Sequence, residues 1–194
     1  GIINFFLDNH LNEDGLLEKL ESWVMIEWSK ANDYIDGVNH PANMLFTRAL
    51  LAAANLYDRT DFGEIAGRNI KTIIAQSFNG QFFEDNRVRN AEGELVKTGN
   101  ISETCQYYAF YFGIIDKRDF PALYTTLFTE FGPNRDDTTT YPEVCRANSL
   151  AGYYMRLDFL MHEGRADQVI DECRDYFLYM AERTGTLWEH DKPH

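Results

Sequence analysis

The chain has 194 residues, of which 44% are hydrophobic and 25% are charged, and its formal net charge is −13. These fractions are typical of one globular domain with a sizeable core and exclude an intrinsically disordered chain. Acidic residues outnumber Lys and Arg by 31 to 18. We therefore expect neither nucleic acid nor an anionic membrane surface as a partner, since both bind basic faces. No apolar run reaches the roughly 20 residues of a membrane-spanning helix.

The first predicted helix covers residues 14–31. Apolar side chains recur there at steps of three to five residues, as they do along one face of a helix, at Leu16, Leu20, Trp23, Val24 and Trp28. Of the two tryptophans in this helix, we expect Trp23 to pack in the core and Trp28 to contact a ligand.

Two longer helices are predicted next. Residues 40–59 have Pro41 in the first turn and an apolar body on nearly all sides, which predicts a deeply buried helix. Residues 61–78 begin with Asp61 and Glu64 at the spacing of a capping box.

The helical pattern breaks near residues 80–98, where short β-type segments flank the sequence "NAEG". This alternation predicts a small β-hairpin. Helices resume over residues 102–114, 119–131, 142–162 and 165–184. Four glycines are expected to end these helices, since glycine readily adopts the left-handed conformation that follows a last turn: Gly113, Gly132, Gly164 and Gly185.

The predicted fold is therefore all-α, a single helical domain of seven helices arranged as successive αα-hairpins with a β-hairpin insertion. Four longer loops are polar and aromatic and recur about once per helix pair, at residues 29–43, 79–99, 132–143 and 183–193. We expect these loops to share one rim of the molecule, where long loops on a rigid scaffold usually carry function.

Several kinds of site are disfavoured. The three cysteines have no CxxC spacing, and the five histidines show neither HxxxH nor HExxH spacing, so no metal site is expected. No phosphate-binding loop, dinucleotide fingerprint or GxSxG elbow is present. No cofactor is expected either.

Four segments in order resemble the C-terminal half of the catalytic domain of bacterial α-L-rhamnosidases, glycoside hydrolase family 78. They are "WVMIEWSKANDYIDGVNHPANMLFTRALLAAANLY", "FNGQFFEDN", "SETCQYYAFYFGI" and "TGTLWEH". The resemblance covers roughly residues 14–191 and implies part of an (α/α)6 toroid, the six-hairpin barrel of these inverting enzymes. Because seven helices make about half of such a barrel, the chain is expected to be a C-terminal fragment of a larger catalytic domain.

The resemblance also implies roles for individual residues. Glu189 matches the general base, and Trp188 beside it either lines the sugar pocket or packs under the loop. Trp28 matches the family's tryptophan after an acidic residue, with Glu27 where relatives usually have Asp. Because rhamnose has a C6 methyl group, an aromatic wall near it would suit this sugar, and we favour Trp28 for substrate contact. The general acid of the family lies upstream, and nothing in this chain matches it.

Other residues have two interpretations. Glu103 opens a predicted helix and either binds sugar hydroxyls or interacts with the helix N-terminus. Asp33 and His40 lie in the first long loop and are substrate-binding candidates. Weaker candidates are Asp36, Asn39, Tyr141, Arg146 and Asn148. Judged by its local sequence alone, Glu189 would be a surface residue near the chain end.

Three functions stay open. The first is an α-L-rhamnosidase-like enzyme acting on terminal rhamnosides, whose isolated fragment would be inactive. The second is a non-catalytic helical module that binds a protein or glycan, and the third is an (α/α)6 hydrolase for another sugar. Half a barrel would leave apolar inner faces uncovered, so we also expect self-association. The compartment stays open: the parent protein would be secreted, periplasmic or cytoplasmic.

Overall fold

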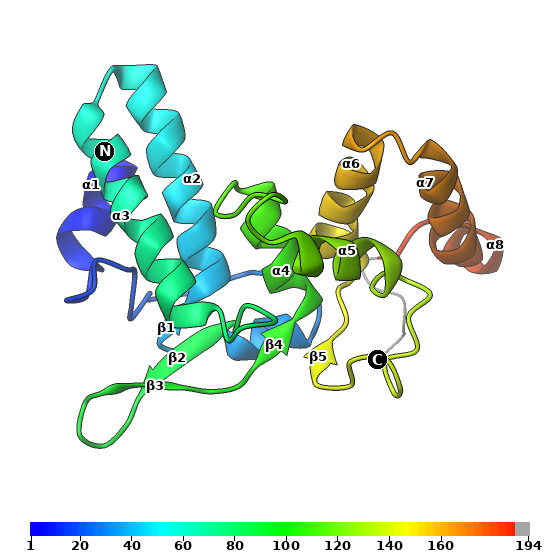
Figure 1. Ribbon diagram of the computed structural model, residues 1–194, viewed down its shortest axis with the longest axis horizontal. Coiled ribbons are helices and arrows are strands. Elements are labelled where there is room, and N and C mark those ends of the chain that lie inside the picture. Colours follow the sequence, from blue (N-terminus) through cyan, green and yellow to red (C-terminus); the bar gives the residue numbers. More distant parts are fainter. Residues whose placement is uncertain (189–194) are drawn as a thin grey trace.

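The computed structural model describes residues 1–188, apart from the side chains of Ser149 and Leu150 (Figure 1). Its α-helices are α1 (Ile2–Asn9), α2 (His40–Tyr57), α3 (Thr60–Ser77), α4 (Glu103–Tyr111), α5 (Pro121–Thr129), α6 (Tyr154–His162), α7 (Ala166–Glu172) and α8 (Tyr179–Thr184). A 3-10 helix, η1, covers Lys30–Tyr34. Two π-helical segments complete the longer helices: η2 (Ser149–Tyr153) leads into α6, and η3 (Cys173–Leu178) joins α7 to α8.

Within residues 1–188, five short strands accompany the helices. An antiparallel sheet has the order β1 (Val38–Asn39), β2 (Asn86–Arg89), β3 (Leu95–Lys97), and β4 (Ile101–Ser102) pairs in parallel with β5 (Val144–Cys145). The predicted hairpin is confirmed, because β2 and β3 are adjacent and pair around the "NAEG" turn. In that turn the Asn90 side chain accepts hydrogen bonds from the backbone N–H groups of Glu92 and Glu94.

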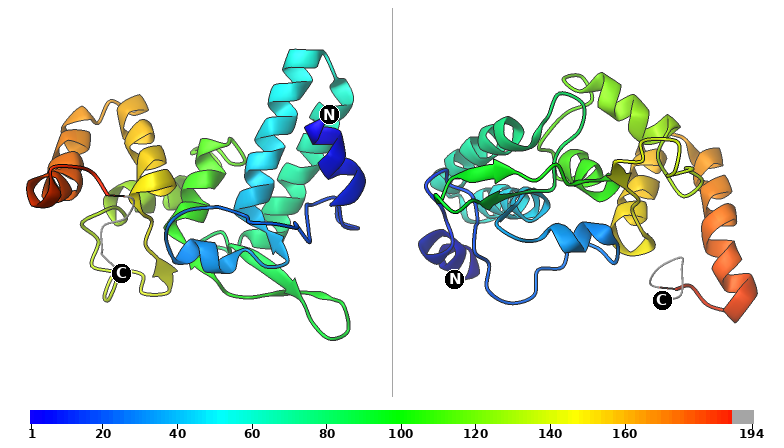
Figure 2. Two further views of the ribbon diagram at one scale, coloured as in Figure 1. Left: turned by 180° about the vertical axis from the view of Figure 1, so that it is seen from behind. Right: turned by 90° about the horizontal axis from the view of Figure 1, so that it is seen from below.

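The helices stand in a curved, open row (Figure 2). Helix α2 packs between α3 and α4, α4 contacts α5 and α6, and α6 contacts α7. A hydrophobic core runs along this row and includes the fully buried side chains of Met44, Phe83, Tyr107, Leu160 and Met180. The all-α class with helical hairpins and one β-hairpin insertion is therefore confirmed.

Three of the four long loops lie along one edge of the molecule. In Figures 1 and 2 the loops around residues 29–39, 79–99 and 132–145 occupy the edge opposite the α2–α3 turn. The N-terminal ends of α2, α4 and α6 point toward this edge. The fourth loop extends beyond residue 188. For the described loops, the expectation of a shared rim is confirmed.

The predicted helix over residues 14–31 is wrong. The chain there is irregular, with left-handed backbone at Lys19 and Ser22, and the first helix is instead α1. Polar side chains bond to this backbone, which lacks the regular hydrogen bonds of a helix. The Asn12 side-chain oxygen accepts from the N–H groups of Asp14 and Leu16. Side-chain acceptors of this kind compete with helix formation.

Two smaller predictions about helix starts differ as well. Asp61 does not cap α3, which begins at Thr60; its carboxylate instead binds the Arg59 guanidinium at 2.6 and 2.8 Å. The helix predicted from residue 142 begins only at Ser149, because residues 144–145 pair with β4. By contrast, Pro41 does lie in the first turn of α2, where the Asn39 side chain accepts from the Ala42 N–H.

Within residues 1–188, no helix combines the length and the apolar character needed to cross a membrane.

Candidate functional site

A polar cleft of about 350 Å³ opens at the loop edge, between η1 and the segment around β5. It is lined by Ser29, Lys30, Asp137, Pro142, Val144, Cys145, Arg146, Ala147 and Asn148. Lys30 and Arg146 contribute cationic groups. Among the described lining residues, Asp137 has the one carboxylate. The lining thus offers both hydrogen-bond donors and acceptors to a small polar ligand.

Asn148 joins the two walls of the polar cleft. Its amide nitrogen donates to the Trp28 carbonyl at 2.6 Å, and its amide oxygen accepts from the Tyr176 hydroxyl at 2.7 Å. The pairing of Ile101 with Val144 and of Ser102 with Cys145 anchors the other wall to the start of α4. These contacts span much of the chain, so the cleft is built by the tertiary structure.

Glu27 adjoins the polar cleft through the lining residue Ser29, whose hydroxyl lies 3.5 Å from the Glu27 carboxylate, and is fully buried. Its carboxylate accepts hydrogen bonds from the backbone N–H groups of Ala151 at 3.1 Å and Gly152 at 2.6 Å, and from the Thr104 hydroxyl. Burial raises the pKa of Glu27, and these hydrogen bonds act in the opposite direction. A carboxylate at the first N–H groups of a helix is electrostatically favourable, so Glu27 fixes the start of η2.

Glu103 is the first residue of α4 and is also fully buried. One carboxylate oxygen lies 2.7 Å from Nε of the buried Arg135, and the other lies 3.5 Å from the Ala147 N–H. Burial raises the pKa of Glu103 to about 7, against the charges of Arg135 and Arg156. Arg135 in turn donates to the carbonyl of Val144 at 2.7 Å. This ion pair therefore supports the cleft wall from behind.

The two tryptophans of the first loop lie side by side. Their ring centroids are 5.7 Å apart at an interplanar angle of 46°. Trp28 is 37% exposed and Trp23 is 66% exposed. The expectation that Trp23 packs in the core is wrong: residue 23 lies in an irregular loop, so the helical stripe that would have buried it does not form.

The remaining site predictions are spread more widely. Asp33 is exposed on η1, three residues after the cleft residue Lys30. His40 is fully buried, with Nδ1 2.7 Å from the Glu84 carbonyl, and burial lowers its pKa to about 4. Substrate binding by His40 remains a prediction. Its complete burial does not support that role.

The C-terminal predictions can be followed only to residue 188. Trp188 is half-buried after α8, where its indole N–H donates to the Thr184 hydroxyl at 2.7 Å and its ring meets Tyr179 at 5.8 Å. Glu189, the predicted general base, lies outside the described residues. Its role stays a prediction.

The structure thus brings Arg146 and Asn148 into one cleft. Trp28 adjoins it through its main-chain carbonyl, and Glu103 adjoins it through the Ala147 N–H. Sequence reasoning missed Lys30 and Asp137 as lining residues. Nothing in the neighbouring sequence marks either residue as part of a site, because a charged residue in a loop is ordinarily exposed to solvent.

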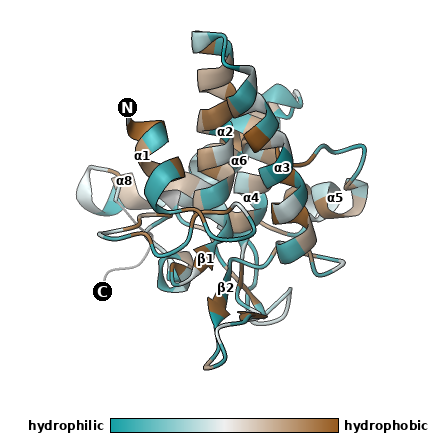
Figure 3. Ribbon diagram, turned by 90° about the vertical axis from the view of Figure 1, so that its left-hand side faces the viewer, coloured by the Kyte–Doolittle hydropathy of each residue, from teal (hydrophilic) through white to brown (hydrophobic). Residues whose placement is uncertain are grey.

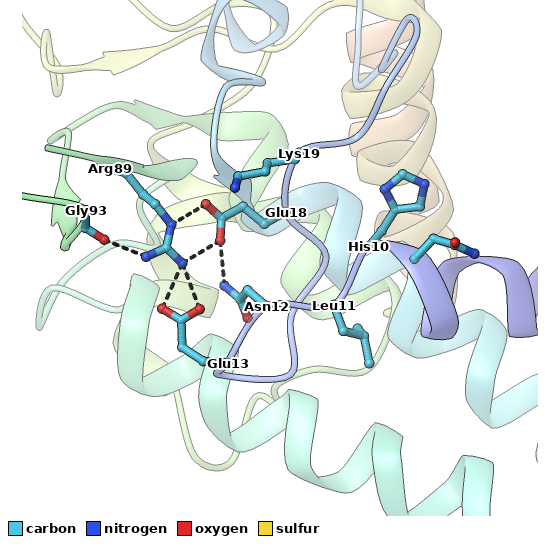
Figure 4. A pocket seen from close by; sticks show the side chains of 9 residues that line it. His10, Leu11, Asn12, Glu13, Glu18, Lys19, Arg89 and Gly93 are labelled. Atoms are coloured by element: carbon cyan, nitrogen blue, oxygen red, sulfur yellow. Dashed lines mark hydrogen bonds and ion pairs between the residues drawn. The ribbon is translucent and has the colours of Figure 1, made fainter. Parts of the chain in front are cut away.

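Further cavities lie away from this cleft. A polar pocket of about 520 Å³ lies between the N-terminal loop and the β2–β3 hairpin (Figure 4). There the Arg89 guanidinium bonds to Glu13 and Glu18 and to the Gly93 carbonyl. An apolar groove of about 300 Å³ separates α1 from α2. No group of three or more potential metal ligands gathers within residues 1–188.

No protein-family model and no curated protein matches this sequence. Solved structures that share the fold include two rhamnosidases. One is the GH78 family rhamnosidase of Bacillus sp. GL1, with a TM-score of 0.73 and 20% identity over 97% of this chain and 19% of that chain. The other is the rhamnosidase from Klebsiella oxytoca with rhamnose bound, with a TM-score of 0.66 and 14% identity over 98% of this chain and 34% of that chain. The chain therefore shares its fold with one part of these rhamnosidases and spans 19% and 34% of their lengths.

Proposed function

We propose that this chain forms part of the active site of a glycoside hydrolase that resembles α-L-rhamnosidases and removes terminal rhamnose with inversion. The observation that carries the proposal is the fold shared with two rhamnosidases over 97% and 98% of the chain, one of them with rhamnose bound. The polar cleft at the loop edge supports it, because Trp28 and Glu103, two predicted site residues, both adjoin this cleft.

A terminal sugar fits the chemistry of the polar cleft. Its volume of about 350 Å³ is in the range of small-molecule sites. Lys30 can donate hydrogen bonds to sugar hydroxyls, and Asp137 can accept them. Trp28, which is 37% exposed and directly precedes the cleft residue Ser29, offers an apolar indole face to C–H groups such as the C6 methyl of rhamnose.

Inverting hydrolysis needs two carboxyl groups about 6.5–9.5 Å apart on opposite sides of the scissile bond. We assign the general base to Glu189. Glu27 and Glu103 are poor candidates, because both are buried and bonded to partners within the fold. We propose that the general acid comes from the remainder of a larger catalytic domain. The match of this chain to only 19% and 34% of the two solved rhamnosidases is consistent with that.

The test is turnover of an aryl α-L-rhamnoside by the longer polypeptide that contains this chain. Glu189→Gln should lower kcat by about 10²–10⁴-fold, the usual contribution of a general base. Glu182→Gln, a change at an exposed position of α8, is the matched control and should leave kcat unchanged. NMR of the first product should show β-rhamnose. Normal turnover by Glu189→Gln would remove this residue from the mechanism.

The longer polypeptide and the 194-residue chain also distinguish this proposal from two alternative functions. The 194-residue chain alone should bind rhamnose without hydrolysing it, because it lacks the acid. A non-catalytic binding module would show binding without turnover even in the longer polypeptide. A hydrolase for another sugar would cleave a different aryl glycoside in a parallel panel.

A further inference from the structure

We propose that Arg135 is a positioning residue, which fixes one wall of the polar cleft by binding backbone carbonyls of the loop that leads into β5. The inference rests on the proposed function for the identity of the ligand, whereas the position of the wall can be measured without any ligand. Three observations carry it: a buried guanidinium, three carbonyls that converge on it, and left-handed backbone at Tyr141.

The guanidinium of Arg135 holds three backbone carbonyls at once. Nη1 donates to the carbonyls of Thr140 at 3.0 Å and Tyr141 at 2.9 Å, and Nη2 donates to that of Val144 at 2.7 Å. The side chain is completely buried, and its Nε lies 2.7 Å from the Glu103 carboxylate. A planar guanidinium presents donors in several fixed directions, which suits such a set of acceptors. Arg135 thereby ties the loop to the first turn of α4.

The loop is strained where Arg135 holds it. Tyr141 has a φ of 53°, in the left-handed region that residues other than glycine seldom occupy. Such a conformation costs free energy and persists where surrounding contacts maintain it. The carbonyls of Thr140 and Tyr141 lie on either side of the strained Cα atom, and both accept from Arg135. The guanidinium therefore maintains a backbone conformation that the loop would not favour by itself.

This loop forms one wall of the polar cleft, and η1 lies on the other side. The lining residues that it and β5 contribute are Asp137, Pro142, Val144 and Cys145. The pairing of β5 with β4 joins only two residues of each strand, so it fixes only one end of the wall. If the three carbonyls were released, the wall would be free to move and the cleft would lose a fixed width.

A second buried ion pair offers a matched control. Arg156 lies 2.7 Å from Glu172, with side chains that are 1% and 9% exposed, and it also donates to the Leu127 carbonyl. None of these three residues lines the polar cleft. A change at Arg156 therefore disturbs a comparable buried charge without releasing the wall.

Cys145 provides a measurement of the wall in the 194-residue chain. It lines the cleft, and burial raises the pKa of its thiol, so it should react slowly with iodoacetamide. Arg135→Lys keeps a positive charge beside Glu103, but one ammonium nitrogen cannot replace donors to three carbonyls. Alkylation of Cys145 should become about tenfold faster, the scale of one lost charge-assisted hydrogen bond. Peptide mass spectrometry follows it, and the fully buried Cys105 should stay unmodified as the internal control for global unfolding.

Rhamnose binding gives the second measurement. Arg135→Lys should weaken the Kd of the 194-residue chain for rhamnose by about three- to tenfold. In the longer polypeptide it should raise the KM for an aryl α-L-rhamnoside and leave kcat nearly unchanged, because the wall binds substrate and transfers no proton. Arg156→Lys should lower the urea midpoint of unfolding but change neither the alkylation rate of Cys145 nor the Kd.

The outcomes separate this proposal from the proposed function. If Arg135→Lys changes neither the alkylation rate nor the Kd, or if Arg156→Lys changes both equally, Arg135 is only structural and the rhamnosidase proposal stands. A fall in kcat at unchanged KM would also overturn the positioning of the wall. Faster alkylation of Cys145 in a chain that does not bind rhamnose would support the positioning and contradict the proposed function.

Amide hydrogen exchange of the wild-type chain decides the question if Arg135→Lys fails to fold. The Val144 N–H donates to the Tyr141 carbonyl at 3.0 Å within the held loop. It should exchange as slowly as the amides of α4. Exchange as fast as that of the exposed Thr138 would show that the wall is not fixed and would overturn the proposal.

Discussion

Glu27 is a carboxylate placed entirely inside the protein, and its environment compensates for the loss of water. It receives two backbone hydrogen bonds from η2, at 3.1 and 2.6 Å, besides the Thr104 hydroxyl. Burying a charge without such partners would be strongly unfavourable. The close approach depends on Gly152, because a Cβ atom there would lie 2.5 Å from Ala147 Cβ and 3.0 Å from Glu27 Oε2.

Gly152→Ala is therefore expected to destabilise the fold by about 1–3 kcal/mol, the usual cost of overpacking a tight interior. It should also weaken rhamnose binding, because Ala147 lines the polar cleft. Urea unfolding and the Kd for rhamnose are the measurements. The control is Gly67→Ala in α3, where a Cβ atom would meet nothing within 4 Å. That variant should be neutral or slightly stabilised, since alanine is the better helix former. A Gly152→Ala protein as stable as wild type would contradict the close packing described here.

At the scale of elements, the irregular segment before α2 is held by remote partners. The Arg89 guanidinium on β2 binds Glu18 at 2.7 Å and Glu13 at 2.8 Å and so fastens the N-terminal loop to the hairpin. The hydrogen bonds from Arg89 lower the pKa of both carboxyls. A carboxyl whose pKa is lowered in the folded state stabilises the fold above its ordinary pKa, 4.5 for Glu18. That contribution is lost as the pH falls through the lowered value.

Arg89→Met should accordingly lower the urea midpoint of unfolding at pH 7, and lower it less at a pH below the pKa of Glu18. It should also speed hydrogen exchange in the β2–β3 hairpin. Arg59→Met is the matched control, because the ion pair of Arg59 with Asp61 is exposed on both sides and such pairs contribute little. Equal effects of the two variants at pH 7 would show that Arg89 does not fasten the loop.

At the scale of the whole molecule, the curved row of helices is open rather than closed upon itself (Figure 2). The groove between α1 and α2 is mostly apolar; it is lined by Ile2, Ile3, Phe6, Leu17, Leu20, Val24, Met25, Ile26, Ala42, Leu45, Phe46 and Ala49. Figure 3 views the molecule from this side and shows apolar residues along α1 and α2. Contiguous apolar surface of this kind favours association.

We therefore predict that the isolated chain self-associates through this groove. Light scattering should give a mass above the 22.5 kDa of one chain, increasing with concentration. Leu45→Glu, which places a charge in the groove at a residue that is 48% exposed, should shift the mass toward 22.5 kDa. Leu56→Glu on the same helix, outside the groove lining, is the control and should not. A wild-type chain that stays monomeric at high concentration would refute the prediction.

The sequence by itself determined the elements whose signals are local. Pro41 marks the first turn of α2, and "NAEG" marks the turn between β2 and β3, because both act through the backbone of their own residues. The order of helices from α2 to α8 and the single β-hairpin follow from such signals and from helical periodicity.

The conformation of the loop before α2 and the arrangement of residues in the candidate site were decided only by the tertiary structure. The apolar spacing of residues 14–31 is compatible with a helix, yet Leu17 bonds through its backbone to Asn43, and Glu18 pairs with Arg89. The polar cleft likewise depends on partners far apart in the chain, such as Trp28 with Asn148 and Glu27 with Gly152. Contacts over such separations leave no periodic trace in the sequence, so whether Glu27 is buried and Trp23 exposed becomes visible only in the folded chain.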